Sequence, residues 1–105
     1  MVSYFMTTEI LDAAYALAKS EFGPYPDKLV AKLRQQFPDI EEPVAEEARA
    51  KADLLVSAAC EWAEQFRGPK NDGTGVPSFQ LADRCPGFSE ATYSDAEAWG
   101  LYLTK

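Results

Sequence analysis

Histidine is absent from the 105 residues, and cysteine occurs only twice, as Cys60 and Cys85. Histidine is the commonest general base and the commonest transition-metal ligand, so its absence removes the usual centres of acid–base and metal chemistry. Two cysteines are too few for a disulfide scaffold. Cys60 falls among helix-forming residues, which favours reduced thiols and a cytoplasmic protein. We therefore predict no catalytic residue, no cofactor and no metal site.

Long apolar runs and an excess of basic residues are also absent. No apolar stretch approaches the 18 or so residues of a membrane-spanning helix. The first six residues have no basic region, so we expect no signal peptide. Ten Lys and Arg against seventeen Asp and Glu give a formal charge of −7. That balance argues against direct binding to nucleic acid or to an anionic membrane, because both attract basic surfaces.

One long helical pattern, at about residues 41–66, dominates what is present. Apolar residues recur in steps of three and four over this stretch, which is typical of an amphipathic helix. Pro43 lies near the start, where its missing N–H costs little. Gly68 and Pro69 supply the expected end. The apolar stripe consists of Ala45, Ala48, Ala52, Leu55, Ala59, Trp62 and Phe66.

Shorter helices are predicted at about 8–22, 26–37 and 89–103. Gly23 and Pro24 follow the first, Pro26 opens the second, and Ser89 or Ser94 can cap the last. Residues 67–87 contain four Gly and three Pro and read as an irregular loop. The sequence thus predicts an all-α fold: one domain over 1–105, with about four helices and the long helix at its centre.

Every seventh residue along one seam of the long helix is alanine, at positions 45, 52 and 59. Small side chains allow another helix to approach to about 8 Å between axes. Two alternatives follow. Ala45, Ala52 and Ala59 pack on the protein's own helices, or they form a helix–helix seam with a second copy and make a homodimer, and both can hold at once.

The opposite face of the long helix is acidic, with Glu42, Glu46, Glu47 and Asp53 as its candidate partner-binding residues. Such a run is often only a solvated face. The leading functional hypothesis is nevertheless a non-enzymatic interaction or regulatory module, whose acidic face meets a basic protein partner.

A small ligand-binding protein or thiol enzyme is the alternative. Its pocket would lie under the 67–87 loop, around Asp83, Arg84, Cys85 and Trp99. A cation beside a thiol lowers the pKa of that thiol, and Arg84 precedes Cys85. Asp83 opposes the effect, and no histidine can serve as the base.

Overall fold

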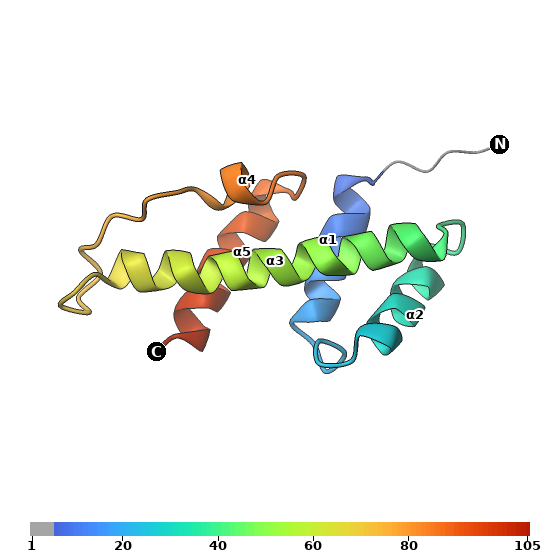
Figure 1. Ribbon diagram of the computed structural model, residues 1–105, viewed down its shortest axis with the longest axis horizontal. Helices are drawn as coiled ribbons and strands as arrows, with labels where there is room; N and C mark the ends of the chain where they lie inside the picture. The colour runs from blue at the N-terminus through green and yellow to red at the C-terminus, as the bar shows by residue number, and fades with distance from the viewer. Residues whose placement is uncertain (1–5) are drawn as a thin grey trace. The chain divides into compact units, whose positions relative to one another are not determined.

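The computed structural model describes residues 6–105, which contain five helices and no strand (Figure 1). Residues 1–5, part of the segment considered above for a signal peptide, lie outside the described residues. The prediction of an all-α fold with one long helix is confirmed. The chain divides into two units, residues 1–53 and 54–105. A single domain over 1–105 stays a prediction. The helices are α1 (Thr8–Ala18), α2 (Pro26–Gln36), α3 (Glu42–Arg67), α4 (Leu81–Arg84) and α5 (Glu90–Leu103).

Helix α1 begins as predicted but ends four residues early. The Thr7 hydroxyl accepts a hydrogen bond from the Ile10 N–H at 3.2 Å and caps the helix. At the other end, the Ser20 hydroxyl donates to the Leu17 carbonyl at 2.6 Å. Serine thus competes for a helix carbonyl and favours a turn over a further helical turn. The prediction that this helix reaches Phe22 is therefore wrong.

Helix α2 starts at Pro26, where a proline loses no intrahelical bond, and it runs to Gln36. Its buried residues, Leu29, Val30 and Leu33, recur at helical spacing. They form the first unit's core together with the buried side chains of α1, the connection before α3, and the first half of α3. The fully or nearly fully buried members include Ile10, Ala14, Leu29, Leu33, Ile40, Ala45, Ala48 and Ala52.

Helix α3 is one continuous helix of 26 residues, within one residue of the predicted bounds at each end. It ends in a tight turn at Gly68, whose φ of 72° suits glycine. The Arg67 carbonyl then accepts from the N–H groups of Asp72 and Gly73, at 3.1 and 3.2 Å. From this turn the chain doubles back to α4 and α5 (Figure 1).

The second unit contains the short helix α4, which the sequence pattern did not reveal within the predicted loop. Of the two start signals for α5, Ser89 is the one used: its hydroxyl accepts from the Thr92 N–H at 3.2 Å. Helix α5 crosses α3 closely. A Cβ added at Gly100 would lie 2.7 Å from the carbonyl carbon of Ala59. Gly100 therefore permits contact with the α3 backbone.

Arg67 fixes the end of α5. Its guanidinium donates to the Thr104 hydroxyl at 2.9 Å and to the Leu101 carbonyl. Leu101 belongs to the last turn of α5, where carbonyl groups have no partner within the helix, and Thr104 is the residue that caps it. Among residues 6–105, no helix is both long and apolar enough to cross a membrane.

Candidate functional site

Three of the four predicted partner-binding carboxylates share one stripe of α3. At about 100° per residue, Glu46 lies about 40° and Asp53 about 20° around the helix from Glu42. Glu47 lies about 140° from Glu42 and about 100° from Glu46. All four side chains are exposed. The helix therefore separates Glu47 from the other three, although it is adjacent to Glu46 in the sequence. We call Glu42, Glu46 and Asp53 the acidic stripe.

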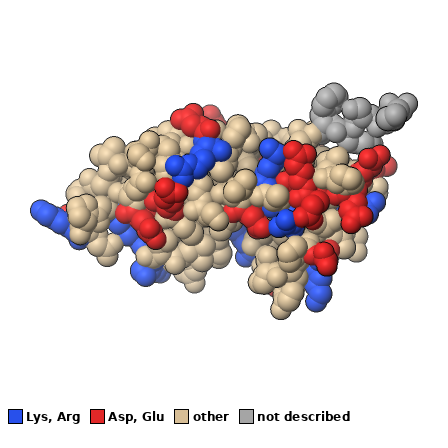
Figure 2. Space-filling model, viewed as in Figure 1, with Lys and Arg blue, Asp and Glu red and all other residues tan. Residues whose placement is uncertain are grey.

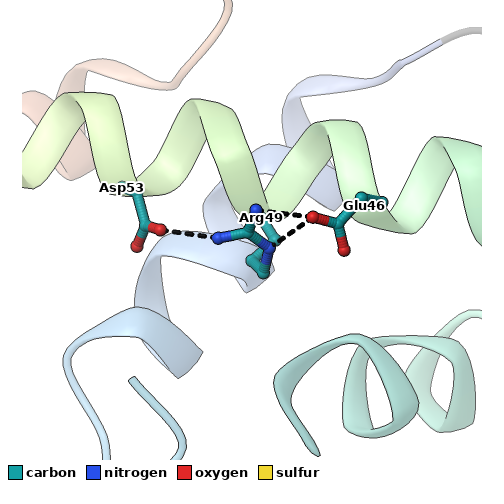
Figure 3. Close-up of polar contacts among 3 residues, drawn as sticks. All are labelled: Glu46, Arg49 and Asp53. Atoms are coloured by element: carbon teal, nitrogen blue, oxygen red, sulfur yellow. Dashed lines mark hydrogen bonds and ion pairs between the residues drawn. The ribbon is translucent and has the colours of Figure 1, made fainter. Parts of the chain in front are cut away.

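Arg49 lies within this stripe and binds two of its carboxylates (Figure 3). Its Nε and Nη2 atoms donate to Glu46 Oε1 at 2.8 and 2.5 Å, and Nη1 donates to Asp53 Oδ2 at 2.7 Å. The hydrogen bonds from Arg49 lower the pKa of Glu46 below its ordinary value, and Glu46 in turn raises the pKa of Arg49. Glu46 therefore stays ionised at pH values where an ordinary glutamate begins to protonate.

A cleft of about 210 Å³ lies between α2 and the N-terminal end of α3. Helix α2 contributes residues at i, i+3, i+4 and i+7, which is one helical face. The lining holds three carboxylates and one guanidinium, so the cleft carries an excess of two negative charges. Acidic side chains gather at the right of Figure 2, where Figure 1 places the N-terminal half of α3. The lining residues are Asp27, Val30, Ala31, Arg34, Glu42 and Glu46.

The cleft brings together residues that the sequence analysis had kept apart. It had placed the candidate partner-binding residues on the long helix alone. Asp27 and Arg34 are therefore site residues that it missed. Their separation by seven positions, two helical turns, was a visible signal that both lie on one face of α2. No pattern indicated that Glu42 and Glu46 would border that face.

The alanine seam is buried within the single chain. Ala45, Ala52 and Ala59 each have 0% exposed surface. Ala59 packs against Gly100 of α5. A second copy cannot reach these three side chains without first displacing parts of the same chain. Packing on the protein's own helices accounts for this burial. A dimer through this seam stays a prediction.

The residues of the alternative pocket have other partners. Arg84 pairs with Glu61 of α3, Nη1 to Oε2 at 2.5 Å, and its guanidinium lies 3.6 Å from the centre of the Phe79 ring. Cys85 is only 8% exposed. Its carbonyl accepts from the Tyr93 hydroxyl at 2.6 Å. A reactive thiol has to be accessible to its substrate, so burial argues against Cys85 as a nucleophile.

The remaining members of that set are Asp83 and Trp99. Asp83 is exposed on α4, and Trp99 stacks on Tyr102 of its own helix with ring centres 5.4 Å apart. The other thiol, Cys60 of α3, has a raised pKa because burial and the nearby Glu64 both disfavour the thiolate. Cys60 thus lacks the electropositive surroundings of a catalytic cysteine, and Cys85 lacks the exposure.

Within residues 6–105, no group of three or more Cys, Asp or Glu side chains is arranged to hold a metal ion. Comparison with protein-family models, with curated proteins and with solved structures found no match. The candidate site therefore has to be judged on its own geometry and charge.

Proposed function

We propose that the protein is a non-enzymatic interaction module of the cytoplasm that binds a basic segment of a partner protein. The segment would lie along the cleft between α2 and α3. The observation that carries the proposal is the cleft itself, which is lined by Asp27 of α2 and by Glu42 and Glu46 of α3. Carboxylates from two helices can contact one cation from two sides, which a single solvated helix face cannot do.

The lining suits the two parts of a basic side chain. Val30 is 7% exposed and forms, with Ala31, an apolar surface between the carboxylates. Lysine and arginine place their aliphatic stems on such a surface and keep the charged group in a polar environment. An arginine adds two parallel hydrogen bonds to a carboxylate, which favours it over lysine.

Arg34 makes the cleft uneven in charge. It lies seven residues from Asp27, which corresponds to about 10 Å along α2. A cation of the partner is therefore expected at the Asp27 end of this face of α2, and a neutral or acidic residue is expected near Arg34. This arrangement would give a bound segment a preferred direction, because like charges placed together weaken binding.

The proposal is tested by charge reversal at two adjacent residues, Glu46→Lys and Glu47→Lys. Both variants change the net charge equally, but only Glu46 lines the cleft. The probe is a fluorescent peptide of alternating arginine and alanine, and binding is measured by fluorescence anisotropy. A unit charge at about 6 Å in water contributes about 0.7 kcal/mol. Reversal changes the charge by two units, about 1.4 kcal/mol, so Glu46→Lys should weaken binding about tenfold.

Glu47→Lys is the matched control and should weaken binding less than about twofold. Its side chain lies about 100° around α3 from Glu46 and does not line the cleft, and salt at about 0.15 M screens exposed charges over about 8 Å. Equal weakening by both variants would mean that binding depends only on net charge. It would refute binding at the cleft. Failure of the wild-type protein to bind the peptide would refute the proposal as a whole. Both variants should fold, because exposed ion pairs contribute only up to about 1 kcal/mol to stability. Circular dichroism checks this.

A further inference from the structure

We draw no further inference here: the strongest candidate, the cleft of about 590 Å³ that Phe22, Pro24 and Tyr25 help to line in the turn between α1 and α2, carries nothing because no feature of the structure shows what covers it.

Discussion

Replacing Gly100 with alanine is expected to destabilise the protein, although the same change normally stabilises a helix. Helix propensity alone favours alanine over glycine in a helix interior by about 1 kcal/mol. At this position the added Cβ would lie 2.7 Å from the carbonyl carbon of Ala59 and 3.2 Å from its Cβ. The carbonyl belongs to the backbone of α3 and cannot rotate aside. Helix α5 would therefore have to move away from α3.

The size of the effect follows from that movement. Carbon atoms in contact are normally about 3.5–4.0 Å apart, so the two helices must separate by roughly 1 Å at the crossing. Overpacking of this kind costs about 1–3 kcal/mol. The upper part of that range applies, because the obstacle is backbone and not the end of a flexible side chain. After subtraction of the propensity gain, we expect Gly100→Ala to lower the free energy of unfolding by about 1–2 kcal/mol.

Urea unfolding followed by tryptophan fluorescence is the appropriate assay. The protein has two tryptophans, Trp62 and Trp99, and both lie in the second unit with the crossing. A change in midpoint at constant slope reports stability directly. The matched control is Ala98→Gly, at an exposed position of the same helix. It should cost about 1 kcal/mol by propensity alone.

A variant Gly100→Ala that is more stable than the wild type would refute this reasoning. It would show that propensity outweighs the contact and that the helices do not approach as closely as described. A second test separates the backbone from the side chain. Ala59→Gly removes the Ala59 methyl but leaves its carbonyl in place. Combining it with Gly100→Ala should therefore restore none of the lost stability, and substantial recovery would place the clash at the methyl group instead.

Three further results are expected. Arg67→Met should speed amide hydrogen exchange in the last turn of α5 and cost about 1–3 kcal/mol, because two part-buried acceptors lose a charged donor. Ala52→Glu should unfold the first unit, since it forces a carboxylate into a fully buried position; a folded monomer by light scattering would contradict that. The pKa of Glu46, measured by NMR, should lie below 4.5 and return toward it in Arg49→Met. Because folding lowers this pKa, the ion pair's stabilisation exists above the unfolded-state value and is lost as the pH falls through the folded-state value.

Periodicity and helix-ending residues were sufficient to predict most of the helices. The bounds of α3 were predicted within one residue, because Pro43 near the start and Gly68 after the end act locally. The end of α1 was missed for a similarly local reason. The Ser20 hydroxyl takes the Leu17 carbonyl, and apolar spacing carries no information about that competition.

Long-range contacts could not be predicted from the pattern. Arg67 reads as a helix-ending cation, but its partners lie 34 and 37 residues further along the chain. Glycine is a poor residue for a helix interior. At Gly100 the missing side chain is nevertheless required, because α5 packs there against Ala59. In both cases the residue type was noticeable in the sequence, but its role depends on a neighbour that only folding supplies.

Glu46 and Glu47 also differ in a way that depends on the fold and not on residue type. A charge count treats Glu46 and Glu47 as equivalent, because they differ by one position. The helix turns them about 100° apart, so Glu46 lines the cleft and Glu47 does not. Arg49 sharpens the difference, since it orients Glu46 and holds its carboxylate ionised. If binding depends on position, these neighbours must behave differently; if it depends only on the charge of −7, they must behave alike. The two variants therefore distinguish binding at the cleft from binding to a merely acidic surface.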